Sequence, residues 1–216
     1  MVSELWKLPA HEVVSLLRTG ALGPLEVLDA AIARIEDVDG AINALPIHCF
    51  ERARDRAQKL DLAAERQNPK SLMGLPIAVK DYNDLGGVRT TYGSPIFKAH
   101  IAQRSDATVA QLERNGANPV AKSNVPEWAG GHTFNPVNGL TCNPWNLSRS
   151  AGGSSGGSAA AVGATLATML LLGPVSNVFD IYGVVLDFVF SALLGGGALA
   201  YATLRKDEVA DYANKF

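Results

Sequence analysis

A run of glycine and serine, residues 149–158, leads directly into an apolar segment that begins at Ala159. Glycines lack a Cβ, so their backbone can adopt positive φ and approach a ligand closely, and the first turn of a helix exposes unpaired N–H groups. The run therefore predicts a loop that enters a buried helix at a binding or catalytic site. The alternative is a flexible linker, although such linkers seldom continue into an apolar helix-forming segment.

A second segment, residues 74–81, has the pattern of a short buried strand. It is apolar from Leu75 through Val79 and then ends in Lys80 and Asp81. A run of this length and composition is typical of a strand in the core. Lysine is mostly exposed in proteins, so Lys80 alone would be interpreted as a solvated cation at a strand end. The two segments together favour a catalytic site.

At these residues the chain resembles the amidase signature family, which comprises serine hydrolases that cleave amide bonds with a Ser, cis-Ser and Lys triad. The run at 149–158 and the upstream Lys80 carry the resemblance, and segments 89–94, 122–127 and 143–150 also look like family sequence. The likeness extends over roughly residues 5–168. It implies an α/β fold, namely a partial amidase-signature fold with a mixed sheet flanked by helices.

The resemblance also implies roles for single residues. Lys80 would be the general base, provided that burial lowers its pKa enough to leave the amine neutral. Ser154, held by a cis peptide bond, would relay the proton between nucleophile and lysine. Ser155, with Gly152 and Gly153, would support the hydrogen-bond network or bind substrate rather than react. No cofactor and no metal are implied.

The resemblance fails where the nucleophile is expected. Family members carry the attacking serine beyond the relay serine, in a Gly-Gly-Ser loop whose N–H groups also form the oxyanion hole. This chain has Val178 at that place, and residues 173–181 contain no such loop. Ser176 lacks the flanking glycines, and Ser191 lies in an apolar run. We therefore expect an amide hydrolase in a truncated or inactive form.

The sequence divides into two parts. Residues 1–168 are predicted to be the N-terminal portion of an amidase-signature domain, and residues 169–216 a divergent apolar tail in which the family pattern is lost. Residues 188–204 carry no charge, but a membrane-spanning helix needs about 20 apolar residues and is weakened by consecutive glycines. The alternative function is a noncatalytic remnant or fusion that binds a partner or a membrane through this tail. A fusion, a truncation and a misjoined gene model all remain open.

Composition limits the partners. A net charge of -2 and a hydrophobic content of 47% describe a soluble globular chain without a basic patch, so we expect no nucleic-acid binding. Two cysteines without CxxC spacing and four scattered histidines give no metal-site pattern and favour a reducing compartment. The N-terminus lacks the apolar core of a secretory signal. We expect a cytoplasmic protein whose substrate, if it is active, is a small amide; the oligomeric state and the amide itself are left open.

Hydrophobic periodicity predicts alternating helices and strands. Helices are expected over residues 11–19, 24–38, 51–66, 105–115 and 158–172, and strands over 75–80 and 119–121. In the second helix Leu25, Leu28, Ile32 and Ile35 should form one apolar stripe. Ser105 is expected to cap the fourth helix. This order predicts a sheet covered by helices, with chemistry in the loops at strand ends.

Overall fold

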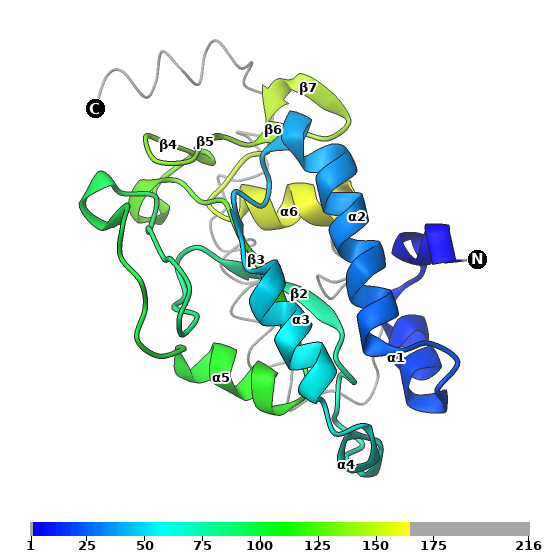
Figure 1. Cartoon of the computed structure of the whole chain (residues 1–216). Helices are drawn as coiled ribbons and strands as arrows, with labels where there is room; N and C mark the ends of the chain where they lie inside the picture. Colours follow the sequence, from blue (N-terminus) through cyan, green and yellow to red (C-terminus); the bar gives the residue numbers. More distant parts are fainter. Residues whose placement is uncertain (1, 165–216) are drawn as a thin grey trace.

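A computed structural model describes residues 2–164 of the chain, which form an α/β fold around a three-stranded sheet (Figure 1). Strand β2 (Pro76–Lys80) runs parallel to β3 (Asn118–Ser123), and β1 (Ile47–His48) pairs with β3 in the antiparallel direction. The register pairs Lys80 with Ser123. Because parallel strands end at the same edge of a sheet, the polar ends of β2 and β3 lie side by side.

Two helices open the described chain after a 3-10 turn, η1 (Val2–Lys7). Helix α1 (Ala10–Thr19) ends at Gly20, which adopts the left-handed conformation with φ of 79° that glycine favours at this position. Helix α2 (Pro24–Ile42) is longer than predicted, and its buried face differs by one position from the expected stripe. Leu28, Ile32 and Ile35 are buried as predicted, but Leu25 is 36% exposed.

The helix predicted over residues 51–66 is two helices, α3 (Phe50–Lys59) and α4 (Leu62–Gln67). Leu60 is extended, and the Asp61 side chain accepts hydrogen bonds from the backbone N–H groups of Ala63 and Ala64. Aspartate is a strong N-cap residue, so Asp61 begins a new helix. The single-helix prediction was wrong because the charged residues on both sides of Asp61 have helical propensity, so nothing in the sequence indicated a break there.

The N-cap of helix α5 (Ala107–Arg114) is Asp106, one residue after the predicted cap Ser105, and its side chain makes no capping hydrogen bond. The Ser105 hydroxyl instead accepts a hydrogen bond from the N–H of Gly86 and donates one to Glu113. Ser105 therefore ties the helix to the loop that follows β2. Gly116 has φ of 79° just after the helix, as expected for a helix stop.

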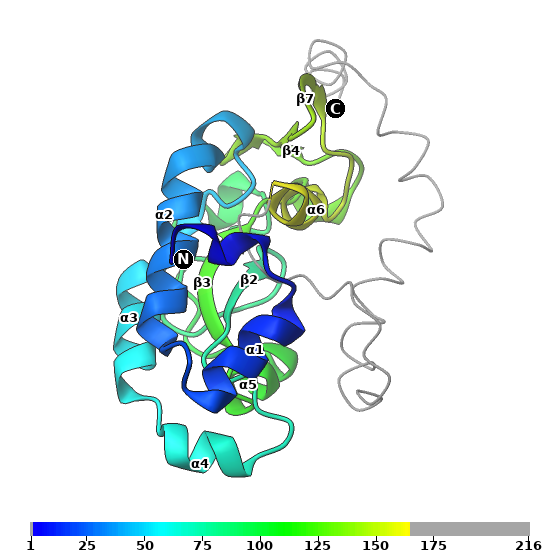
Figure 2. The same cartoon turned by 90° about the vertical axis from the view of Figure 1, so that its right-hand side faces the viewer.

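Helices cover both faces of the sheet. Helices α2 and α3 lie together on one side of the strands, and α1 and α5 lie toward the other (Figure 2). Two buried apolar clusters fill these layers. The first includes Val13, Leu17, Val79 and Val109, and the second includes Leu28, Ile35, Ala53 and Ala161. Burial of this apolar surface is the main driving force for the fold.

The C-terminal part of the described chain contains short hairpins and one helix. Strands β4 (Phe134–Asn135) and β5 (Gly139–Leu140) form one hairpin, and β6 (Cys142–Asn143) and β7 (Asn146–Ser150) another. The 3-10 turns η2 (Pro95–Phe97) and η3 (Glu127–Ala129) lie in the preceding loops. Helix α6 (Gly156–Gly163) starts two residues before its predicted start, and the predicted continuation to residue 172 lies outside the described residues. Across residues 2–164 no helix combines the length and apolar character needed to cross a bilayer.

Candidate active site

The amine of Lys80 and the hydroxyl of Ser154 meet at the edge of the sheet. Lys80 is the last residue of β2, and its Nζ donates a hydrogen bond of 3.0 Å to Ser154 Oγ. Ser154 lies in the Gly/Ser loop just before α6, which contacts both β2 and β3. Residues that are 74 positions apart in sequence are thus brought into direct contact.

Burial changes the chemistry of this lysine. The side chain of Lys80 is only 8% exposed, and loss of solvation lowers its pKa to about 8. Burial disfavours the charged form of an amine because the protein interior solvates charge less well than water does. A substantial fraction of Lys80 is therefore neutral slightly above neutral pH, and the neutral amine can accept a proton from a hydroxyl.

The loop before α6 is held by close backbone contacts. The peptide bond between Gly153 and Ser154 is cis, and Gly152 has φ of 76°. A Cβ at Gly153 would collide with the carbonyl oxygen of Gly131. The carbonyl oxygen of Gly152 accepts a hydrogen bond of 2.8 Å from the N–H of Thr133. Gly152 and Gly153 therefore fix the path of the loop against residues 131–133.

Ser155 takes a different position from Ser154. It is the N-cap residue of α6, its side chain makes no capping hydrogen bond, and its backbone carbonyl accepts from the N–H of Ala159. Its side chain is half-buried. The structure therefore brings Ser154, and not Ser155, to the amine of Lys80 among the contacts it describes.

A second hydroxyl pair joins α6 to the sheet. Ser158 Oγ, in the first turns of α6, lies 2.6 Å from Ser123 Oγ, and both side chains are fully buried. Ser123 is the register partner of Lys80. Gly157 approaches the same strand end so closely that a Cβ there would overlap the backbone of Asn124. These contacts fix the distance between α6 and the edge at which Lys80 lies.

Sequence reasoning did not assign a role to four buried polar residues around this edge. Ser123 and Ser158 form the hydroxyl pair, and Asp81 and Lys122 form an ion pair with 3.2 Å between Oδ1 and Nζ. One signal could have revealed Lys122: this lysine directly follows the apolar residues 119–121 within a core strand. A charged side chain in a core strand requires a buried partner.

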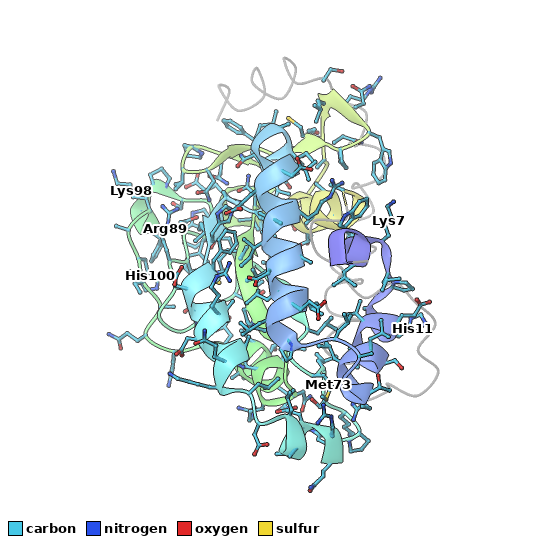
Figure 3. The ribbon with its side chains drawn as sticks, turned by 45° about the vertical axis from the view of Figure 1, so that its right-hand side comes forward. Lys7, His11, Met73, Arg89, Lys98 and His100 are labelled. Atoms are coloured by element: carbon cyan, nitrogen blue, oxygen red, sulfur yellow. The ribbon has the colours of Figure 1, made fainter. Side chains whose placement is uncertain are left out.

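The histidines do not cluster, although His132 lies beside the Gly/Ser loop. His11 and His100 lie on opposite sides of the molecule (Figure 3). His132 Nδ1 lies 3.0 Å from Ser150 Oγ, in the segment leading to the Gly/Ser loop. Within residues 2–164 there is no group of three His, Cys, Asp or Glu side chains suited to hold a metal ion.

Several residues named from the sequence lie outside the described residues. Val178, Ser176 and Ser191 belong to this part of the chain, as does the uncharged run at 188–204. The division of the chain near residue 168 also falls there. The observed contact therefore joins Lys80 and Ser154.

Comparisons with known proteins identify the family of this chain. The amidase family model matches residues 26–171. The chain is 38% identical over 169 residues to one component of the glutamyl-tRNA(Gln) amidotransferase of Caldanaerobacter subterraneus subsp. tengcongensis, an alignment that covers 78% of this chain and 35% of the relative. The protein belongs to the amidase family, and it spans about a third of the length of the curated relatives that it matches.

Solved structures lead to the same conclusion about the fold. A chain of a vestigial protein complex connected with the origins of an s-triazine catabolic enzyme matches with a TM-score of 0.69 and 36% identity, over 74% of this chain and 36% of that one. The 6-aminohexanoate cyclic dimer hydrolase, solved with its substrate, matches with a TM-score of 0.68 and 33% identity, over 76% of this chain and 33% of that one. The described part thus has the fold of the N-terminal portion of amidase signature enzymes, as the sequence predicted.

Proposed function

We propose that Lys80 and Ser154 form the proton-transfer half of an amide-hydrolysing site. The observation that carries this proposal is the 3.0 Å hydrogen bond between a buried lysine amine and a serine hydroxyl. Among residues 2–164, the contact described for the Lys80 amine is this hydroxyl and not a carboxylate. A lysine with a lowered pKa in such a position is a candidate functional group.

The chemistry follows from the two side chains. A hydroxyl nucleophile gives its proton to Ser154 Oγ while the proton of Ser154 passes to the neutral amine of Lys80. The oxygen of the nucleophile bonds to the amide carbon, and the carbon–nitrogen bond then breaks as the proton returns through Ser154 to the departing amine. Water cleaves the resulting ester by the same route. Lys80 is thus the general base and Ser154 the relay, with Ser155, Gly152 and Gly153 supporting the loop.

The third member of the site is not supplied by the sequence at its expected place. Val178 has no group that can attack a carbonyl, and its neighbours lack the glycines of an oxyanion loop. We infer that this polypeptide does not complete amide hydrolysis by itself and is an inactive form of the enzyme. Its substrate class, by family, is the carboxamide of a small molecule; the relatives' names include a cyclic dimer hydrolase and an amidotransferase.

A fluorophosphonate probe tests the catalytic part of this proposal. Such a probe labels serines that a nearby base has activated. We expect no stoichiometric labelling of the purified chain and no turnover of a simple carboxamide. Turnover that is abolished by Lys80→Ala, or labelling mapped to Ser176 or Ser154, would contradict the proposed inactivity. A Lys80 amine that titrates at its ordinary value of about 10.4 would contradict the proposed role of Lys80 as a base.

The uncharged run at 188–204 supports a second candidate function, a noncatalytic remnant that associates with a membrane. Flotation with liposomes tests it directly. The full chain would be compared with a variant in which two leucines of the run, Leu193 and Leu194, are replaced by aspartate. Recovery of both proteins in the dense fraction would eliminate this candidate.

A further inference from the structure

A small cavity lies at the end of the parallel strands that is opposite to Lys80. It is lined by Arg56 and Ala57 of α3, by Ala117 and by Asn118, the first residue of β3. The volume open to the centre of a water molecule is about 10 Å³, which is about the space that a single water molecule needs. The cavity is therefore large enough for one molecule of this size and for little more.

The cavity arises where small side chains face each other. Helix α3 packs on β3 (Figure 1). Its residues Ala53 and Ala57, one turn apart, are buried in the same apolar cluster as Val120 and Ala121 of β3. Residues four positions apart lie on one face of a helix, so this face of α3 carries only methyl groups at the two positions. The helix and the strand thus leave a gap between them near the start of β3.

Two polar atoms of the lining residues are buried without a partner among residues 2–164. They are Oδ1 of Asn118 and Nε of Arg56. Asn118 is only 2% exposed, so bulk water does not reach its side chain. Buried polar atoms in folded proteins nearly always have a hydrogen-bond partner, which is either a protein group or an ordered water. The cavity and these two atoms together point to a bound molecule.

The hydrogen bonds around the cavity fix what each atom needs. Asn118 Nδ2 donates to the carbonyl oxygen of Ala53 at 2.9 Å. A flipped amide would bring two oxygens together, so the oxygen of Asn118 is the group left to accept. Arg56 donates through its terminal nitrogen to the carbonyl oxygens of Glu113 and Ala117. Its Nε–H remains to donate. The bound molecule must therefore both donate and accept.

This requirement selects a neutral ligand. An anion would accept from Arg56 but would also face the amide oxygen of Asn118. A metal cation would bind that oxygen but would be repelled by the guanidinium group of Arg56. Water donates and accepts, and a buried water typically makes about three hydrogen bonds. Water also matches the size of the cavity.

We propose that one buried water molecule occupies this cavity, accepts a hydrogen bond from Arg56 Nε–H and donates one to Asn118 Oδ1. The water joins the last turns of α3 to the start of β3, and it belongs to the fold in the same sense as a side chain does. The proposal is independent of the proposed function of Lys80, because the cavity lies at the other end of the strands.

Nuclear magnetic resonance tests this proposal through the Nε–H proton of Arg56. The full chain is labelled with 15N, and the Arg56 signal is assigned by its loss in Arg56→Lys. A water that stays bound gives cross-peaks of opposite sign in the laboratory and rotating frames, whereas proton exchange gives the same sign in both. We expect the opposite-sign pair at Arg56. Arg54, whose guanidinium pairs with Asp29 at the surface, should not give it.

Variants of the lining residues locate the water. Asn118→Leu removes the acceptor and fills the cavity, so the cross-peaks of Arg56 with water should be lost. Asn115→Leu is the matched control, because the Asn115 side chain is bonded at the surface to Gln111, and it should keep their full intensity. If Asn118→Leu does not fold, Ala57→Val fills the cavity from the helix and leaves Asn118 in place. It should lower the intensity to less than half.

Each result supports or overturns the proposal. The opposite-sign pair at Arg56 in the wild type, with its loss in Asn118→Leu or its reduction in Ala57→Val, supports a bound water in this cavity. A wild-type Arg56 that shows exchange alone, as an exposed arginine would, overturns the proposal without any variant. Full intensity in Asn118→Leu or Ala57→Val also overturns it, because the water would then contact Arg56 from another side.

Discussion

The two buried lysines at the end of the central sheet, Lys80 and Lys122, differ in what surrounds the amine. Lys122 is completely buried and lies 3.2 Å from a carboxylate. Lys80 is 8% exposed, and the bond described for its amine goes to the hydroxyl of Ser154. Both lie at the ends of parallel strands and only one register position apart. At this edge of the sheet, one lysine is thus paired with a carboxylate and the other with a hydroxyl.

The comparison shows how the surroundings of a buried lysine set the pKa of its amine. Burial lowers the pKa of both amines, but at Lys122 the carboxylate of Asp81 opposes this effect. At Lys80, within the part of the chain that the structure describes, desolvation acts without an opposing anion, and the pKa falls to about 8. The carboxylate partner of Lys122 makes this lysine part of a buried ion pair, whereas Lys80 becomes partly neutral slightly above neutral pH. Each of the following experiments alters one side of this contrast.

The largest effect is expected from Lys122→Met. The substitution leaves the buried Asp81 carboxylate without its cation, and breaking a buried ion pair in this way costs about 3 to 5 kcal/mol of unfolding free energy. Urea denaturation followed by circular dichroism measures the loss. The double variant Asp81→Asn/Lys122→Met should recover most of it, because neither charge is then buried. A Lys122→Met protein as stable as the wild type would show that the pair is not structural.

Lys80→Met should have the opposite sign. Below about pH 8 Lys80 is protonated in both the folded and the unfolded protein, so the full cost of burying its charge is present. As pH rises from about 8 toward the unfolded value, the folded protein releases its proton first and this cost disappears. After allowance for the lost bond to Ser154, we expect the variant to be more stable at pH 7 by on the order of 2 kcal/mol.

The pH dependence is the decisive part of this measurement. The advantage of Lys80→Met over the wild type should shrink steadily between pH 8 and pH 10, as judged by parallel denaturation curves. Ser154→Ala serves as the control, because it removes the same hydrogen bond and leaves the amine in place. A difference between Lys80→Met and wild type that stays constant over this range would mean that Lys80 is not a desolvated lysine.

Local pattern predicted the position of Lys80 but not its burial, and its expected role came only from the family resemblance. Lys80 ended a recognisable apolar strand, and Ser154 lay in a Gly/Ser run, so the edge of the sheet and the entry to α6 followed from local pattern. Lys122 was not predicted to have a role, because its burial depends on Asp81 and Thr90 from another segment. Long-range pairing of this kind leaves no periodic signal in a single sequence.

The same reasoning explains the errors in the fold. The general order of helices and strands and the α/β class followed from periodicity, whereas the break between α3 and α4 depended on one capping side chain, that of Asp61. The two-residue strands of the hairpins were also missed. They are too short for alternation to show, and they are held by long-range bonds such as the one from Asn124 Nδ2 to the carbonyl oxygen of Gly139.

A smaller effect is expected from the neutral contact on the Lys80 face. Ser158→Ala removes the hydroxyl that lies 2.6 Å from Ser123 Oγ, and the expected loss is about 1 kcal/mol. Ser123→Ala should cost a similar amount, and the double variant should cost less than the two together because the pair acts as a unit. Additive losses in a double-mutant cycle would show that the two hydroxyls are not coupled and that α6 is held by its backbone contacts.

The smallest effect is expected from an exposed lysine, which shows what the removal of a lysine does when neither burial nor a buried partner is involved. Lys59 in α3 pairs with Asp55 one turn earlier at 2.6 Å, and the two side chains are 74% and 57% exposed. Solvent screens this pair, so Lys59→Met should change the unfolding free energy by no more than about 0.5 kcal/mol, and less in high salt. If Lys59→Met proved as costly as Lys122→Met, the helical and apolar properties of lysine itself, rather than its buried charge, would explain the contrast between the two lysines at the sheet edge.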